Sequence, residues 1–163
     1  MEVPANCNIR SARAADAERL LDIRRRAILE LAVPALSSAQ AQAWAAGRDL
    51  TWMTALISTH PLWIADLDGA IVGWIVLDEN RVIGLYVDPL YSRRGFGSHL
   101  LAMAERELWA GGARTVTLES SWNAEEFYLH RGYEPLADRP ADGARPMQKT
   151  LGSLEGSRVK AAG

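Results

Sequence analysis

Two arginines and two glycines lie within five residues in the stretch SRRGFGSHLL, which begins at Ser92 and follows an apolar segment. Gly95 and Gly97 have no Cβ, so their backbone can approach a ligand closely. The first N–H groups of a helix have no intrahelical partner, and the helix dipole favours an anion beside them. Arg93 and Arg94 add positive charge there. The stretch is a candidate cradle for a phosphate or pyrophosphate, although a tight strand-to-helix turn with two solvated arginines would have the same pattern.

Two common phosphate-binding patterns do not fit this stretch. A Walker A loop requires a Lys-Ser or Lys-Thr pair after its last glycine, and none follows Gly97. The dinucleotide-binding fingerprint requires a third glycine, and Leu100 stands in that place. A different phosphate-containing ligand is therefore indicated.

Coenzyme A fits better, because LYVDPLYSRRGFGSHLL resembles the acyl-CoA signature of the GNAT superfamily of N-acetyltransferases. In that signature an apolar strand is followed by V-x-P and then by R/Q-x-x-G-x-G/A at the start of a helix. A second segment, NAEEFYLHRGYE, is similar to the family's N-x-x-A-x-x-F-Y-x-x-x-G-F/Y segment, with a shorter gap before the Phe-Tyr pair. The resemblance extends from about Ile9 to Leu151. It implies that the protein transfers an acetyl group from acetyl-CoA to an amine.

The resemblance also implies which residues act. Backbone amides of Tyr86 and Val87 would hold the pantetheine arm and polarise the acetyl carbonyl, and Tyr128 would protonate the departing thiolate. A phenol of pKa about 10 can donate to a thiolate whose conjugate acid has a pKa of about 8.5. The alternative for Tyr128 is a packed aromatic side chain beside Phe127. The predicted CoA contacts are Leu85, Tyr86, Val87, Arg93, Arg94, Gly95, Phe96, Gly97, Ser98, Asn123 and Tyr128, and no metal is expected.

Two positions depart from the family pattern. Ser92 stands where the signature has Arg or Gln, so pyrophosphate binding must depend on Arg93, Arg94 and backbone amides. Gly84 stands where some members carry an acidic general base. The sequence pattern therefore does not identify the general base at this position.

Glu119 is the preferred candidate for the general base, because in the family the strands that match Val87 and Glu119 diverge to admit the ligand. Asp78 and Glu79 lie in a turn, where a carboxylate is usually solvated. His60 has a suitable ordinary pKa and precedes a proline in a loop. A water relay with no decisive side chain is a further alternative.

Hydrophobic periodicity predicts the elements that position these residues. Strands are expected at 9–12, on both sides of Asp68-Gly69, at 81–87 and 114–119, from Tyr133 and at 147–151. Helices are expected from an N-cap at Asp16 to Pro34, at 37–47, from the glycine loop to Ala110, and from Asn123 to Gly132; the type of 49–58 is uncertain. This order predicts an α/β fold with a mixed, mostly antiparallel sheet, a parallel β-loop-α-β crossover at the acyl-CoA site, and helices on both faces.

Length, composition and charge limit the number of domains, the cellular compartment and the classes of partner that we expect. The chain has 163 residues, 48% hydrophobic and 23% charged, with a formal net charge of -2. We expect a single domain over 1–151 and a loose tail over 152–163. The charge does not favour nucleic acid, and no apolar run approaches the ~20 residues of a membrane span. One cysteine, Cys7, and no signal-peptide pattern predict a cytoplasmic protein, monomeric or homodimeric.

The acceptor is the least determined part of the prediction. The preferred substrate is a primary amine of a small molecule; a protein or peptide amine and a non-catalytic acyl-CoA-binding module are the alternatives. Trp44 and Trp52 fall in the helical N-terminal region, which in the family often forms one wall of the acceptor site. Trp122 lies between Glu119 and Asn123, near the expected acetyl end.

Overall fold

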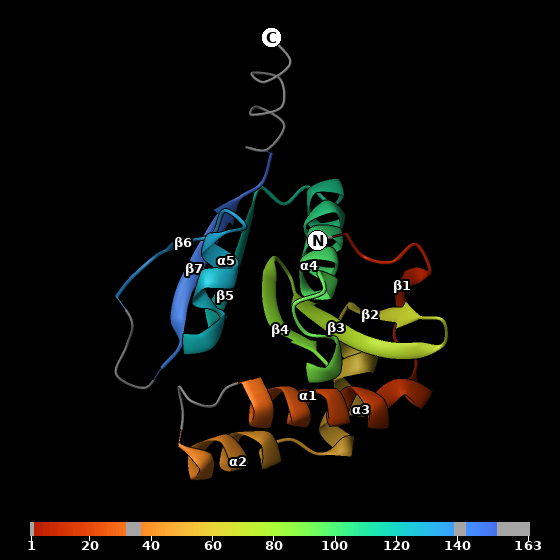
Figure 1. Cartoon of the computed structure of the whole chain (residues 1–163). Coiled ribbons are helices and arrows are strands. Elements are labelled where there is room, and N and C mark those ends of the chain that lie inside the picture. Colours follow the sequence, from red (N-terminus) through yellow and green to blue (C-terminus); the bar gives the residue numbers. More distant parts are fainter. Residues whose placement is uncertain (1, 32–36, 139–142, 153–163) are drawn as a thin grey trace.

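One seven-stranded sheet organises the part of the chain described by the computed structural model, which comprises residues 2–31, 37–138 and 143–152 (Figure 1). The strand order is β1-β2-β3-β4-β5-β7-β6. The strands are β1 Cys7–Ser11, β2 Leu62–Leu67, β3 Ala70–Asp78, β4 Arg81–Val87, β5 Thr115–Ser120, β6 Glu134–Pro135 and β7 Arg145–Thr150. All neighbouring strands are antiparallel except β4 and β5, which run parallel. The predicted mixed sheet with one parallel crossover is confirmed.

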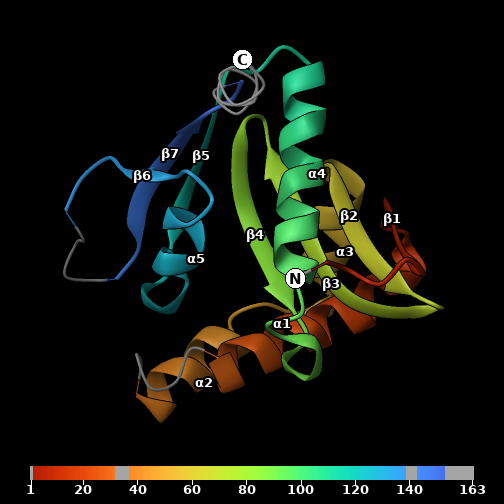
Figure 2. The same cartoon turned by 45° about the horizontal axis from the view of Figure 1, so that its top comes forward.

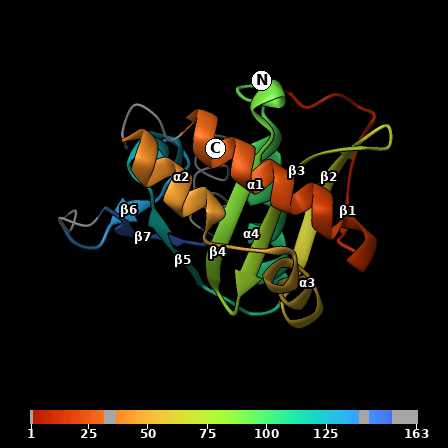
Figure 3. The ribbon, with the colours of Figure 1, turned by 90° about the horizontal axis from the view of Figure 1, so that it is seen from below.

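Helices cover both faces of this sheet, as predicted. They are α1 Ala17–Leu31, α2 Ser38–Ala46, α3 Leu50–Thr59, α4 Phe96–Ala110 and α5 Glu125–Leu129, with short 3-10 turns η1 Ala14–Asp16, η2 Pro89–Tyr91 and η3 Trp122–Ala124. Seen from below, α1 and α3 lie across the strands and α2 packs beside α1 (Figure 3). The helices α4 and α5 lie on the other face (Figure 2).

The helix boundaries agree with most of the local signals. Ser37 caps α2 by accepting a hydrogen bond from the Gln40 N–H, and Gly47 ends that helix, as predicted. The uncertain segment is helix α3. The N-cap prediction for Asp16 was wrong: Arg13 precedes η1, and the Asp16 carboxylate accepts the Arg13 N–H at 2.8 Å from within the turn. Pro34 and most of the expected tail, from residue 153 onward, lie outside the described residues.

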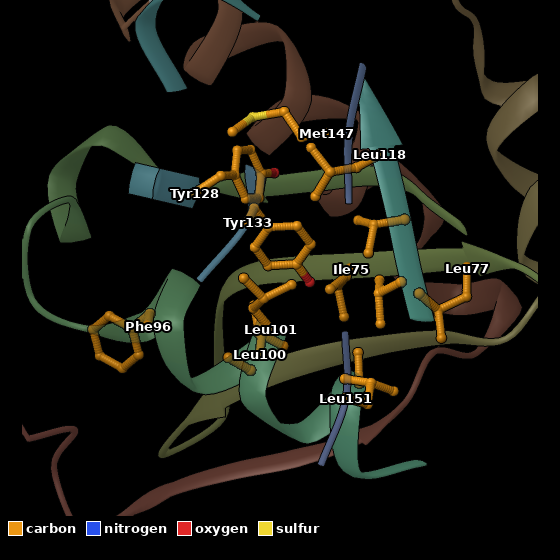
Figure 4. Close-up of a cluster of buried hydrophobic side chains, with 14 of the residues drawn as sticks. Ile75, Leu77, Phe96, Leu100, Leu101, Leu118, Tyr128, Tyr133, Met147 and Leu151 are labelled. Atoms are coloured by element: carbon orange, nitrogen blue, oxygen red, sulfur yellow. The ribbon is translucent and has the colours of Figure 1, made fainter. Parts of the chain in front are cut away.

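Two hydrophobic clusters fix the layers. The first joins α1 and α3 to the sheet through side chains such as Leu20, Met53 and Trp74, whose indole N–H donates to the Leu20 carbonyl at 3.0 Å. The second joins α4 and α5 to the opposite face through Leu100, Tyr128 and other residues drawn in Figure 4. Both clusters reach β4, so the strand that carries the expected site is held from both sides.

The strands β4 and β5 pair only at their beginning. Arg81 and Val82 are opposite Thr117 and Leu118, and no later β4 residue pairs with β5. The register between β3 and β4 shifts directly after this point, which leaves Ile83 as an extra residue. A bulge of this kind bends and twists a strand. It therefore accounts for the separation of β4 from β5, visible in Figure 2, beyond Val82.

Candidate active site

The separation of β4 and β5 opens two adjoining cavities. The larger, of about 200 Å³, lies toward the start of α4 and includes Val87, Gly97 and Phe127 in its lining. The smaller, of about 110 Å³, lies toward Ile83 and Glu119. Six residues line both cavities: Trp44, Leu85, Tyr86, Ser121, Ala124 and Tyr128. The two cavities are consequently the two ends of one site that passes between the strands.

The register of β4 decides which backbone groups reach this opening. The Asp88 N–H donates to the Val72 carbonyl at 2.8 Å, on the β3 side. Because hydrogen-bonded pairs alternate along an antiparallel ladder, the Tyr86 backbone also faces β3, opposite Trp74. The N–H groups of Leu85 and Val87 are those that face the open edge. Leu85 therefore replaces Tyr86 as the second candidate amide donor, and Tyr86 reaches the site with its side chain.

The glycine loop contains one left-handed glycine directly before α4. Gly95 precedes α4 with φ +88°, in the left-handed region that favours glycine. An added Cβ at Gly97 would lie 3.5 Å from the Phe127 ring and 3.6 Å from Val87 Cγ2. The missing side chain thus keeps the larger cavity open beside the helix N-terminus. This is the feature that a coenzyme A pyrophosphate and pantetheine arm would need.

Side chains around the loop divide into two groups. Arg93 and Arg94 are exposed, and the Arg94 guanidinium lies over the Tyr91 and Phe96 rings. Phe96 itself is 1% exposed and belongs to the core, so only its backbone can face a ligand. The hydroxyl of Ser98 accepts hydrogen bonds from Arg131, one of them at 2.7 Å.

Arg131, which the sequence reasoning did not select, supports Phe127 in the wall of the larger cavity. Its guanidinium lies 3.7 Å from the centre of the Phe127 ring and donates to the Phe127 carbonyl at 2.7 Å. Together with the Ser98 hydrogen bonds, these contacts connect the start of α4 to α5. The i to i+4 spacing of Phe127 and Arg131 was the available signal.

Tyr128 is placed between the two cavities. It is 8% exposed and lines both of them. Its ring packs edge-on against Phe127. It also packs edge-on against Tyr133, which Figure 4 shows beside it. Burial, with a smaller contribution from nearby Tyr86, raises the pKa of the Tyr128 phenol above its ordinary value. A phenol is protonated at neutral pH even at its ordinary pKa of about 10, so the hydroxyl is in the form that an acid needs.

The segment before α5 completes the wall. Ser121 precedes the turn η3 and donates from its hydroxyl to Asn123 Oδ1 at 3.0 Å. Asn123 lines the larger cavity and lies within η3. Trp122 is 63% exposed. Ser121 and Ala124, which the sequence reasoning did not select, line both cavities.

Glu119 lies at the smaller cavity, as its predicted role requires. Its side chain is 57% exposed and forms an ion pair with Arg81 at 3.2 Å. The other candidate bases lie elsewhere: Asp78 ends β3, and His60 contacts the Thr59 hydroxyl at 2.8 Å with its second ring nitrogen 4.0 Å from Asp78. Of the candidates, Glu119 is the one that borders the described cavities.

Asp88 connects the end of β4 to helix α1. Its carboxylate is 1% exposed and accepts hydrogen bonds from Arg19 at 2.6 Å, Arg26 at 3.1 Å and the Leu90 N–H at 3.0 Å. Burial alone would raise the pKa of Asp88, but the bonds from Arg19 and Leu90 and the two positive charges outweigh it and lower that pKa. The residue directly after β4 is thereby locked to α1.

Comparisons with known proteins agree with this geometry. The family model of the GNAT acetyltransferase domain matches residues 33–150, and the chain belongs to this family. An uncharacterised N-acetyltransferase of Escherichia coli K12, YafP, is 31% identical over 134 residues, covering 80% of this chain and 83% of YafP. A GCN5-related N-acetyltransferase from Rhodopseudomonas palustris superposes with a TM-score of 0.86 at 29% identity, covering 93% of this chain and 99% of the other.

A third protein, more distant in sequence, has the same fold. The PaiA N-acetyltransferase of Thermoplasma acidophilum, solved in complex with coenzyme A, has a TM-score of 0.79 at 19% identity, with 89% of this chain and 99% of that one covered. In the described part of this chain, no helix is long and apolar enough to cross a membrane. The same residues hold no group of three or more His, Cys, Asp or Glu that could bind a metal ion.

Proposed function

We propose that the protein transfers the acetyl group of acetyl-CoA to a primary amine of a small molecule by direct attack of the amine on the thioester. The observation that carries this proposal is the position of Tyr128, whose residue lines both of the joined cavities and is buried at their junction. A protein that only binds acyl-CoA has no need of an acid at the junction of two cavities. Membership of the acetyltransferase family supports the same proposal.

The donor half of the site would hold coenzyme A mainly with backbone groups. The loop from Arg93 to Gly97 and the N-terminus of α4 suit the pyrophosphate, and Asn123 borders the cavity for the pantetheine arm. When bound, acetyl-CoA supplies an activated acetyl thioester. The open-edge N–H groups of Leu85 and Val87 would donate to its carbonyl oxygen; one donor of this kind contributes about 2.7–4 kcal/mol to catalysis.

The proton transfers are assigned to two side chains. Glu119, acting directly or through a water molecule, takes a proton from the incoming ammonium so that its nitrogen can attack the carbonyl carbon. The nitrogen of the resulting adduct then releases its second excess proton to water, and Tyr128 gives its phenolic proton to the sulfur as the C–S bond breaks. Solvent then returns a proton to Tyr128 and removes the one held by Glu119. The products are the acetylated amine and the free thiol.

Thiol release from acetyl-CoA, followed with a thiol reagent across a panel of amines, tests this function. We expect at least one small primary amine to accelerate release, with stoichiometric formation of its N-acetyl product. Release that no amine accelerates, together with tight acetyl-CoA binding, would instead establish the non-catalytic acyl-CoA-binding module. Acceleration by peptides alone would assign the acceptor to proteins.

A further inference from the structure

Arg131 lies just after α5, and its guanidinium reaches the first turn of α4. It donates two hydrogen bonds to the Ser98 hydroxyl oxygen, one from Nε at 2.7 Å and one from Nη2. It donates a third from Nη1 to the Phe127 carbonyl at 2.7 Å. A guanidinium has five N–H groups. The other two have no hydrogen-bond partner among the described residues.

The charge of Arg131 also has no carboxylate partner in the part of the chain that the structure describes. Arg145, by contrast, is paired with Glu125. Partial burial lowers the pKa of the Arg131 guanidinium, with a smaller opposite contribution from Tyr128, but a guanidinium stays charged in proteins. A partly buried charge costs free energy unless an opposite charge lies beside it. An anion beside Arg131 would remove that cost.

The bonds from Arg131 also limit what the Ser98 hydroxyl can do. A hydroxyl accepts through two lone pairs and donates one hydrogen. Because Arg131 donates twice to this oxygen, its own hydrogen is left for another acceptor, and no described residue supplies one. The first bond within α4 runs from the His99 N–H to the Gly95 carbonyl, so the N–H groups before His99 have no partner within the helix. The start of α4 therefore presents several donors without an acceptor.

Open space borders these donors. Gly97 lines the larger cavity, which lies between the strands. Gly95 and Ser98 line a separate open groove of about 500 Å³ between the start of α4 and the N-terminal segment 2–7. A ligand that leaves the larger cavity beside Gly97 therefore passes the Ser98 hydroxyl.

The glycine loop has fewer free polar side chains than its sequence indicates. Ser92 stands where the family signature has Arg or Gln, and its hydroxyl donates to the Pro89 carbonyl at 2.9 Å. The Arg94 guanidinium lies over two aromatic rings of the same segment. A cation from another element can supply the charge that is missing at position 92.

We propose that Arg131 is a positioning residue for the diphosphate of coenzyme A: it turns the Ser98 hydroxyl hydrogen toward a phosphate oxygen and places an uncompensated positive charge behind it. Hydrogen bonds to an ionised group are about twice as strong as those between neutral groups, so an oriented hydroxyl is most effective beside a phosphate. This inference rests on the proposed use of acetyl-CoA and adds a residue outside the loop to its binding site.

Three related ligands test the inference by calorimetric titration. Coenzyme A carries the diphosphate and a 3′-phosphate, dephospho-coenzyme A keeps only the diphosphate, and pantetheine, measured by competition, has neither. Arg131→Met keeps an unbranched apolar side chain against Phe127 and removes the charge. It should raise the Kd of the first two ligands about tenfold and that of pantetheine less than about twofold.

The other outcomes would overturn the inference in distinguishable ways. An equal rise in Kd for all three ligands would make Arg131 a support of the cavity wall only. A rise confined to coenzyme A would assign its charge to the 3′-phosphate, and no rise would exclude it from the site. A parent protein that binds none of the ligands would overturn the proposed function itself, whereas tight binding by the parent with an unchanged Arg131→Met would overturn only the inference.

Arg114→Met is the matched control. Arg114 also lies over an aromatic ring, 4.3 Å from the centre of Trp109, and donates to a backbone carbonyl, but it follows the far end of α4. This variant should leave all three Kd values unchanged. The thermal midpoint of each variant shows whether it is folded.

Two further variants test the action through Ser98. Ser98→Ala should reproduce most of the loss seen in Arg131→Met, and Arg131→Lys, which keeps the charge but cannot donate as a planar fork, should reproduce part of it. The losses in Ser98→Ala and Arg131→Met should combine less than additively in the double variant. Full additivity would overturn the positioning of Ser98 by Arg131.

Discussion

The two ends of the site are built in different ways. At the donor end, the loop and the start of α4 are consecutive in sequence and act largely through backbone groups. At the proposed acceptor end, the lining residues Trp44, Tyr86 and Glu119 come from α2, β4 and β5, three separate elements. Backbone chemistry suits a ligand that is the same throughout a family, whereas side chains from separate elements can change independently. The difference explains why the donor was readable from a local motif and the acceptor was not.

Removal of one hydroxyl at the junction of the two ends should have the largest effect. We expect Tyr128→Phe to lower kcat by about 10²–10⁴ with little change in the Kd for acetyl-CoA, because the phenol acts only on the departing sulfur. Since the pKa of Tyr128 is raised, any basic limb due to it in the parent pH–rate profile should lie above pH ~10, and it should be absent in the variant.

Tyr133→Phe is the matched control for Tyr128→Phe. The Tyr133 ring packs 5.5 Å from that of Tyr128, but its hydroxyl donates to Glu105 at 3.1 Å, away from the described cavities. This variant should lower the thermal midpoint and leave kcat per folded molecule near the parent value. A folded Tyr128→Phe protein with full activity would exclude Tyr128 as the acid.

The donor end can be disrupted separately by filling its cavity. Gly97→Val should weaken acetyl-CoA binding about 10- to 100-fold, a loss of about 1.4–2.7 kcal/mol, because the added methyl groups occupy space beside Phe127 and Val87. Gly111→Val, at the other end of α4, controls for the cost of a branched residue near a helix terminus. The φ of Gly111 is -80°, and a Cβ added there would meet only backbone oxygens, at 3.5 and 3.6 Å. Calorimetry would measure both, and equal affinities in the two folded variants would remove Gly97 from the site.

The attachment of the donor end to α1 is tested by Asp88→Asn. We expect a loss of about 2–3 kcal/mol in the free energy of unfolding at neutral pH, because a buried carboxylate between two arginines loses its charge. Asp22→Asn, at a side chain 52% exposed on the same helix, should change stability by less than about 0.5 kcal/mol.

The same pair of variants has a pH signature. The pKa of Asp88 is lower in the folded protein than its value of about 3.9 in the unfolded chain. The ionised carboxylate therefore stabilises the folded parent fully above pH ~4, and this stabilisation is lost as the pH falls through the folded-state pKa. Asp88→Asn should therefore show a shallower loss of stability in that acidic window, measured by denaturant titration. An identical acid dependence in parent and variant would contradict the assignment.

The smallest effect is expected at the acceptor end. Glu119→Gln should lower kcat/KM less than tenfold and shift the acidic limb of the pH–rate profile, because an exposed carboxylate can be replaced in part by water. Asp78→Asn is the control at a carboxylate of similar exposure, 59%, outside the described cavities. If Asp78→Asn moves the acidic limb and Glu119→Gln does not, the base is wrongly assigned.

Local signals predicted the elements well where one strong feature decided the structure. The Asp68-Gly69 turn joins β2 to β3 with φ of 52° and 88°, as a two-residue hairpin requires. Ser37 marked the start of α2 and Gly95 the start of α4, because a side-chain cap and a positive φ are each properties of a single residue. The Asp16 cap was misplaced because the same carboxylate can accept an N–H as a cap or from within the turn, and its ion pair with Arg10 selects the second.

The sequence by itself determined the sheet's elements, the glycine loop at the start of α4 and the family, since these depend on residue types at short spacing. Only the tertiary structure decided that the Tyr86 ring covers Gly84, that Leu85 rather than Tyr86 turns its N–H to the opening, and that Arg131 joins α4 to α5. Strand register and the packing of distant side chains set those contacts. Neither is encoded at the spacing of a local motif, because each depends on where a second element of the chain lies.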